Sequence, residues 1–87
     1  MQVLEIRVLE QEAGYIYYRR TYRATALLLL LTKNVEVPIH FIIETNAAGI
    51  HTIDVRLEGS VDYPLLPVVK ALKTEILNMD QKGLLPC

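Results

Sequence analysis

A run of apolar residues at positions 24–32 limits what this chain can fold into. It reads Ala-Thr-Ala, five consecutive leucines and a threonine, so it has no polar side of its own. It is far too short to cross a bilayer, which takes about 20 apolar residues. The run must therefore be covered by protein on both faces. Either it is a central strand or helix of a core, or one of its faces meets a second chain.

Three other segments alternate polar and apolar residues, which is the pattern of a half-buried strand. They span residues 3–10, 35–45 and 50–58. The segment 15–23 is rich in tyrosine and arginine and leads directly into the leucine run. We expect four antiparallel strands. The alternative for the run is a short helix over residues 23–33, because alanine and leucine are good helix formers.

Loop lengths decide which residues face each other, since a slip of one residue would turn every side chain to the other face. A three-residue loop ending at Gly49, with this glycine left-handed, is a common hairpin type. It pairs Ile43 with Ile53 and Phe41 with Val55. Apolar residues then face apolar residues along this whole hairpin.

The other two hairpins can be assigned in the same way. A two-residue turn at residues 33–34 pairs Leu30 with Val37. A three-residue loop after the first strand sets Ile6 opposite Arg20. The three hairpins agree on one core face, which favours a strand over a helix for the leucine run.

The last part of the chain predicts one amphipathic helix, from about Pro67 to Lys82 and ended by Gly83. Its apolar stripe consists of Val68, Val69, Leu72, Ile76 and Met79. The predicted fold is α+β: a four-stranded antiparallel meander followed by one C-terminal helix (ββββα), in a single compact domain of residues 1–87. The apolar tail after the helix packs back on the sheet or reaches another chain.

Composition excludes several classes of partner. Nine basic and ten acidic residues nearly cancel, which argues against a dominant electrostatic partner such as duplex nucleic acid or an anionic membrane. The single cysteine, Cys87, allows neither an intramolecular disulfide nor a zinc site built on thiolates. The first residues lack a basic segment followed by an apolar run, so they do not form a signal peptide. We expect a cytoplasmic protein.

Catalytic patterns are weak in this sequence. On the outer face of the predicted sheet, His40 lies opposite Arg56 and diagonal to Asp54. A carboxylate that orients a histidine can serve acid–base chemistry, but no nucleophile joins the pair and surface solvation is the simpler interpretation. We also find no metal-ligand spacing and no phosphate-binding glycine loop. We therefore expect no enzyme, no cofactor and no metal.

A strand rich in tyrosine and arginine is the first candidate for binding. Tyr15, Tyr17, Arg19 and Arg23 share the outer face with Arg7. Aromatic rings interleaved with arginine on an open sheet are used to stack and neutralise single-stranded nucleic acid. The order of elements resembles, in topology alone, that of the dimeric Whirly and Pur-type single-strand binders. The alternative is structural, because acids on the same face can pair with the arginines across strands.

The leucine run supplies the second candidate, which leads. Alternate residues of a strand point to opposite faces, so Leu27, Leu29 and Leu31 emerge outside the core, with Ile42 beside them. Such a patch is larger than a small monomer usually exposes. The leading hypothesis is a small homo-oligomeric protein-interaction or scaffold domain, most simply a twofold dimer. Neither a pathway nor a ligand follows from the residues.

Overall fold

The computed structural model describes residues 1–12 and 18–86. Four strands and one helix follow each other along the chain, and the strands form a single antiparallel sheet in sequence order. The elements are β1 (Gln2–Gln11), β2 (Arg19–Leu30), β3 (Lys33–Thr45), β4 (His51–Leu57) and α1 (Leu65–Gln81). The predicted ββββα fold is confirmed, and the leucine run belongs to β2 and not to a helix.

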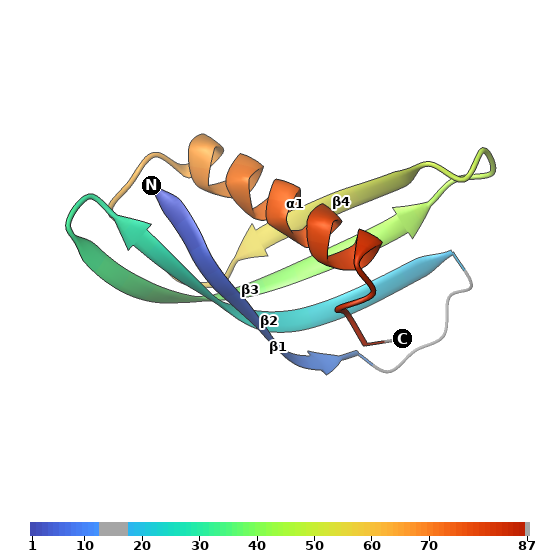
Figure 1. Cartoon of the computed structure of the whole chain (residues 1–87), viewed down its shortest axis with the longest axis horizontal. Coiled ribbons are helices and arrows are strands. Elements are labelled where there is room, and N and C mark those ends of the chain that lie inside the picture. The colour runs from blue at the N-terminus through green and yellow to red at the C-terminus, as the bar shows by residue number, and fades with distance from the viewer. Residues whose placement is uncertain (13–17, 87) are drawn as a thin grey trace.

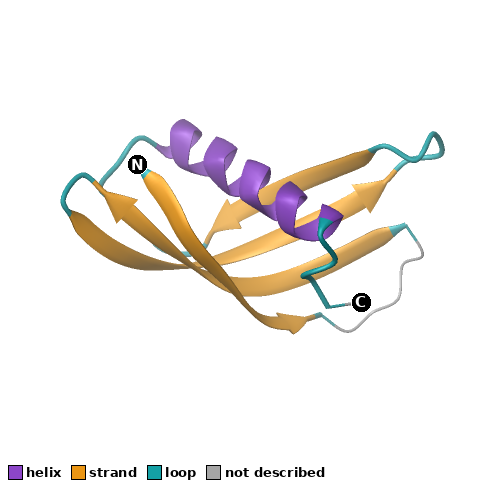
Figure 2. Ribbon diagram, viewed as in Figure 1, coloured by secondary structure: helices purple, strands orange, loops and turns teal. Residues whose placement is uncertain are grey.

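The molecule has two layers. The sheet is strongly twisted, and α1 crosses one of its faces diagonally (Figures 1 and 2). The N-terminus lies near the start of α1, and the C-terminal tail folds down beside the end of the helix toward β2 (Figure 1). In the described part of the chain, no further element covers the other face of the sheet.

Alternation along β2 builds the middle of the core. Tyr22, Ala24, Ala26, Leu28 and Leu30 are almost completely buried beneath α1. The Tyr22 ring stacks on that of Phe41 in β3, with ring centroids 5.0 Å apart. From the helix side, the predicted stripe covers these residues: three of its members are fully buried and two partly buried, namely Val68, Leu72 and Ile76, and then Val69 and Met79.

The β3–β4 hairpin has the predicted register. Ile43 lies opposite Ile53 and Phe41 opposite Val55. The loop is closed by the Asn46 side chain, whose Oδ1 accepts hydrogen bonds from the N–H groups of residues 48 and 50 at 2.9 and 3.0 Å. Gly49 has a φ of 81°, the left-handed conformation that this loop type requires.

Gly49→Ala should lower the free energy of unfolding by roughly 1 kcal/mol, because an added Cβ opposes a positive φ. No atom outside the loop lies within 4 Å of that Cβ position, so the cost is one of backbone conformation alone. Gly59→Ala is the matched control: its φ is not positive and the new Cβ would make ordinary contact with Pro38 at 3.5 Å. Urea unfolding of both variants tests this; equal midpoints would contradict a left-handed Gly49.

The predicted β2–β3 register is wrong by two residues. The turn lies at Leu31 and Thr32 instead of residues 33–34, so Leu30 pairs with Lys33 and not with Val37. An even shift keeps every side chain on its expected face. The tighter turn brings Tyr22 opposite Phe41, where the two rings stack. It also places Leu31 in the left-handed region, at a φ of 53°.

The predicted β1–β2 register is also wrong. Ile6 lies opposite Ala26 and not opposite Arg20. Register shifts around Leu4 and Leu9 interrupt β1, and both leucines are exposed, as expected for residues at bulges. β1 therefore pairs mainly with the leucine run. The predicted loop over residues 12–14 falls largely outside the described residues.

The helix begins two residues earlier than predicted. Leu65 is its first residue and Pro67 its third. Proline breaks no hydrogen bond there, because the first N–H groups of a helix have no acceptor within it. At the other end, Gly83 has a φ of 69° and donates to Asp80 O at 3.1 Å, while the N–H of Leu84 donates to Met79 O at 2.9 Å. These two bonds make a Schellman motif.

The tail after α1 packs back on the sheet. Leu85 is buried, and the Tyr22 hydroxyl donates to the Pro86 carbonyl at 2.6 Å. Nearby, Arg20 of β2 binds Asp80 of α1 at 2.9 Å. Partial burial lowers the pKa of Arg20, but the hydrogen bond to Asp80 and the attraction of Tyr22 and Asp80 outweigh this and leave the pKa raised. Arg20 therefore stays charged across the physiological range. Cys87 lies outside the described residues.

Candidate interaction surface

The arginines on the outer face of the sheet are neutralised within the chain. Each binds a carboxylate on its own strand or on the next one: Arg7 with Glu5 (3.4 Å), Arg19 with Glu44 (3.2 Å) and Arg23 with Glu10 (2.7 Å). These exposed pairs add little stability. They do occupy two of the predicted nucleic-acid contacts, Arg19 and Arg23. The other two, Tyr15 and Tyr17, lie outside the described residues.

His40 has a carboxylate partner, but a different one from that suggested by the sequence. Its Nε2 lies 2.7 Å from Oε1 of Glu12 and not beside Asp54. Arg56 lies opposite His40, as predicted. All of these side chains sit on an open sheet face. Among residues 1–12 and 18–86, no group of three or more histidine, cysteine or acidic side chains is placed to hold a metal ion.

The structure does not bring the four predicted interface residues together. Leu27 and Leu29 share the outer face of β2, where both are half-buried. Leu31 lies in the turn and is 82% exposed. Ile42 lies opposite Thr21, six residues along β2 from Leu27, because of the two-residue difference in the β2–β3 register. Leu31 alone of the four presents most of its side chain to water.

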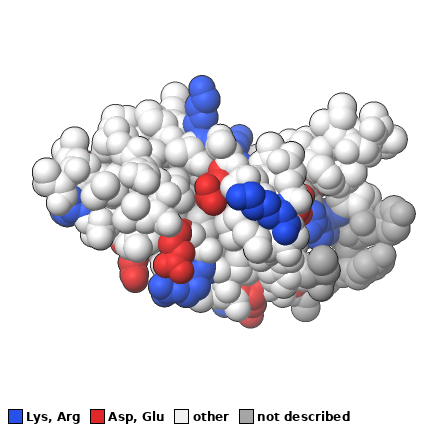
Figure 3. All heavy atoms as spheres, in the orientation of Figure 1, with Lys and Arg blue, Asp and Glu red and all other residues white. Residues whose placement is uncertain are grey.

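Other exposed leucines gather at the same end of the molecule as Leu31. Leu65 and Leu66, in the first turn of α1, are 55% and 82% exposed. This end, which carries the β2–β3 turn and the start of the helix, shows few charged atoms (Figure 3). We call the three leucines the apolar end. Leu65 and Leu66 were missed from sequence because they were assigned to the loop before the helix.

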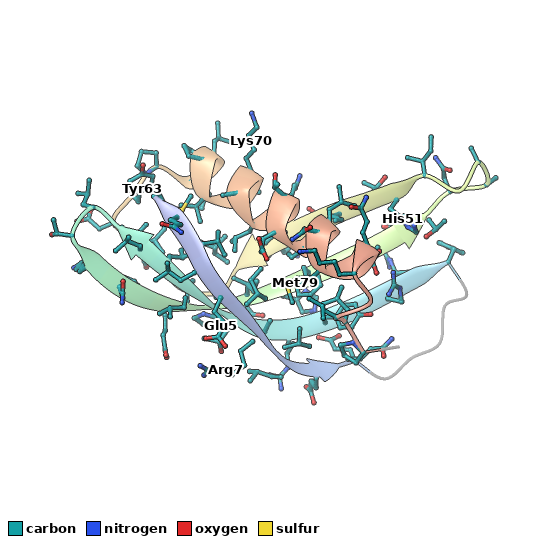
Figure 4. All side chains as sticks on the ribbon, in the orientation of Figure 1. Glu5, Arg7, His51, Tyr63, Lys70 and Met79 are labelled. Carbon is teal, nitrogen blue, oxygen red and sulfur yellow. The ribbon has the colours of Figure 1, made fainter. Side chains whose placement is uncertain are left out.

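Three hollows surround the connection between β4 and α1. One of about 530 Å³ separates β1 from α1, one of about 590 Å³ separates β4 from α1, and one of about 300 Å³ lies beside the β2–β3 turn. Tyr63 lines the first two and Val61 lines the last two, so they form one continuous surface. Tyr63 lies close to the N-terminal end of β1, whereas Lys70 points away from the sheet (Figure 4).

β4 forms a regular free edge of the sheet. The N–H of Glu58 bonds Pro38 O, and antiparallel ladders alternate bonded and non-bonded pairs. The even-numbered residues of β4 therefore bond to β3, and Ile53, Val55 and Leu57 turn their N–H and C=O groups outward. The other edge, β1, is interrupted by two register shifts, whereas the β3–β4 ladder has none. Bulges protect an edge from pairing with another chain, so β4 is the unprotected one.

Two charged residues stand beside this edge without a partner in the described part of the chain. Asp54 and Arg56 are exposed on the outer face of β4. Four of the five arginines bind a carboxylate. Within the described ranges, Arg56 is the arginine that has none.

These features define a class: a small α+β domain with one helix on one sheet face, a regular free edge and an apolar end. The chain belongs to the BB_0187 family, whose model matches residues 1–81. No curated protein and no solved structure matches it. The description of the family names no activity or ligand. In the part of the chain described here, no helix has the length and apolar character needed to cross a bilayer.

Proposed function

We propose that this protein is a small interaction domain that associates with a second copy of itself and has no catalytic role. The observation that carries this proposal is the apolar end, where Leu31 and Leu66 are each 82% exposed. Full coverage of one leucine removes apolar surface worth about 1.5–3 kcal/mol from water. Contiguous exposed apolar surface is typical of a protein contact.

The backbone of Leu31 supports the same conclusion. Its φ of 53° lies in a region that costs a residue with a Cβ roughly 1–2 kcal/mol, and hairpin turns of this kind favour asparagine or glycine. The leucine is therefore unfavourable in the isolated chain for its backbone and for its exposed side chain. Burial against a second protein would offset both costs. Strained positions of this kind are found at functional sites.

Charge and site geometry favour this function over the others considered. The bases that a nucleic acid would need are already bound to carboxylates, as in Arg19 with Glu44. The His40–Glu12 pair lies on an open sheet face and has no nucleophile bonded to it among the described residues. A single cysteine suits a reducing compartment, so we place the self-association in the cytoplasm.

Sedimentation of the wild-type chain at tens of micromolar tests the proposal, and we expect a dimer. The triple change Leu31→Asn, Leu65→Gln and Leu66→Gln should shift it toward monomer without loss of fold, because all three side chains are exposed. The matched control is Leu4→Gln with Leu9→Gln, two exposed leucines of β1, which should leave the dimer intact. A wild-type chain that sediments as a monomer would refute self-association.

A further inference from the structure

We propose that two copies of this chain pair their β4 strands antiparallel, about a twofold axis at Val55, and so join two four-stranded sheets into one. This inference rests on the proposed self-association and specifies its geometry. Three features of β4 carry it: its unpaired backbone groups, its two charges without partners among the described residues, and the apolar hollow beside it.

The backbone of β4 is ready for such pairing. Ile53, Val55 and Leu57 direct their N–H and C=O groups away from β3, as the ladder alternation requires. With the axis at Val55, this residue pairs with itself and Ile53 pairs with Leu57 of the second copy. These pairs would form about six hydrogen bonds between the chains. β1 offers no such edge, because register shifts interrupt it near Leu4 and Leu9.

Charge selects this register among its neighbours. With the axis at Val55, Asp54 lies opposite Arg56 of the second copy, and the twofold repeats the pair. A shift by two residues in one direction places Asp54 opposite itself, and a shift in the other places Arg56 opposite itself. Like charges directly across an antiparallel pair are unfavourable. The self-complementary register also gives Arg56 the carboxylate that the described part of its own chain does not provide.

The apolar hollow extends the contact beyond the strands. It lies between β4 and α1 and is lined by Val55, Leu57, Val61, Leu65 and Val69, among others. A twofold axis perpendicular to the joined sheet keeps both helices on the same side of it. The hollows of the two copies then face each other across the axis. Leu65, which is half exposed in the single chain, would be covered there and would link the strand pairing to the apolar end.

Charge reversal tests the register. Asp54→Arg turns both interchain pairs into Arg–Arg, and Arg56→Asp turns both into Asp–Asp. Each variant alone should dimerise on the order of tenfold more weakly than the wild type. An equimolar mixture of the two variants restores opposite charges in both pairs, so a heterodimer should form with close to wild-type affinity. Sedimentation of each variant and native mass spectrometry of the mixture measure these outcomes.

Two controls match these changes on exposed sites away from β4. Glu36→Arg reverses an acid on β3, Lys73→Asp reverses a base on α1, and neither should alter the dimer. Circular dichroism verifies that every variant is folded. If the wild type is a dimer and both β4 variants dimerise equally well, edge pairing is refuted while self-association stands. Weakened variants whose mixture does not recover would refute the register. A monomeric wild type would remove both proposals together.

Discussion

Leu28→Glu should prevent this chain from folding, whereas Leu29→Glu should leave it folded. Leu28 is fully buried, with Val3 and Val35 opposite it on the two neighbouring strands. A carboxylate buried there has no cationic partner, and the penalty is several kcal/mol. A domain of 87 residues has a total stability of roughly 4–13 kcal/mol, so this single change removes most of it.

Leu29 is the matched control because it is the next residue on the same strand. It is half-buried on the outer face, opposite Gln2 and Asn34, and a glutamate there keeps its contact with water. Far-UV circular dichroism and urea unfolding of the two variants decide the point. Sedimentation of Leu29→Glu adds a second test, because pairing through β4 leaves Leu29 outside the contact. Loss of the dimer in this variant would favour the leucine-run interface predicted from sequence.

Leu85→Ala should destabilise the protein by about 2 kcal/mol, the lower end of the range for a leucine truncated in a core. The Leu85 side chain is only 6% exposed and belongs to the same core cluster as Tyr22 and Phe41. The tail is held in place by the Schellman motif at Gly83 and by the Tyr22–Pro86 hydrogen bond. A truncated side chain at this position therefore leaves a cavity beside the sheet instead of a change in solvent.

The adjacent leucine provides the comparison for this prediction. Leu84 is 62% exposed, so Leu84→Ala should change stability by less than about 0.5 kcal/mol. Urea unfolding monitored by tyrosine fluorescence measures both variants. Equal midpoints for the two would mean that the tail is not docked on the sheet in solution.

Local signals in the sequence were enough to predict the β3–β4 hairpin. Asn46 and Gly49 lie in the loop itself, and together they specify its length and the left-handed position. The strand order, the core faces and the helical stripe also followed, because each depends on a short-range period. These features make up the ββββα fold.

Registers that depend on a less typical turn could not be predicted. Residues 33–34 include an asparagine, which hairpin turns favour, yet the turn uses Leu31 and Thr32. The stacking of Tyr22 on Phe41 outweighs this local preference. The shifts near Leu4 and Leu9 depend on how β1 fits the whole of β2, and no window within β1 encodes them.

The candidate surface was predicted only in part, for the same reason. Leu31 was identified from its place in the leucine run, and it is exposed. Ile42 was grouped with it through a register that differs by two residues. The free guanidinium of Arg56 is invisible in the sequence, because it depends on which carboxylates the other four arginines reach in the described part of the sheet.

The strand order has a consequence for synthesis of the chain. Each strand pairs only with its neighbour in sequence, so every hairpin can close over a short loop as soon as it leaves the ribosome. The cover for the core face comes last, since α1 begins at residue 65 and Leu85 follows it. A nascent chain that has completed β4 therefore carries a full sheet with a bare apolar face, a state prone to aggregation. The interval in which the last 30 or so residues emerge is when this protein most needs a chaperone.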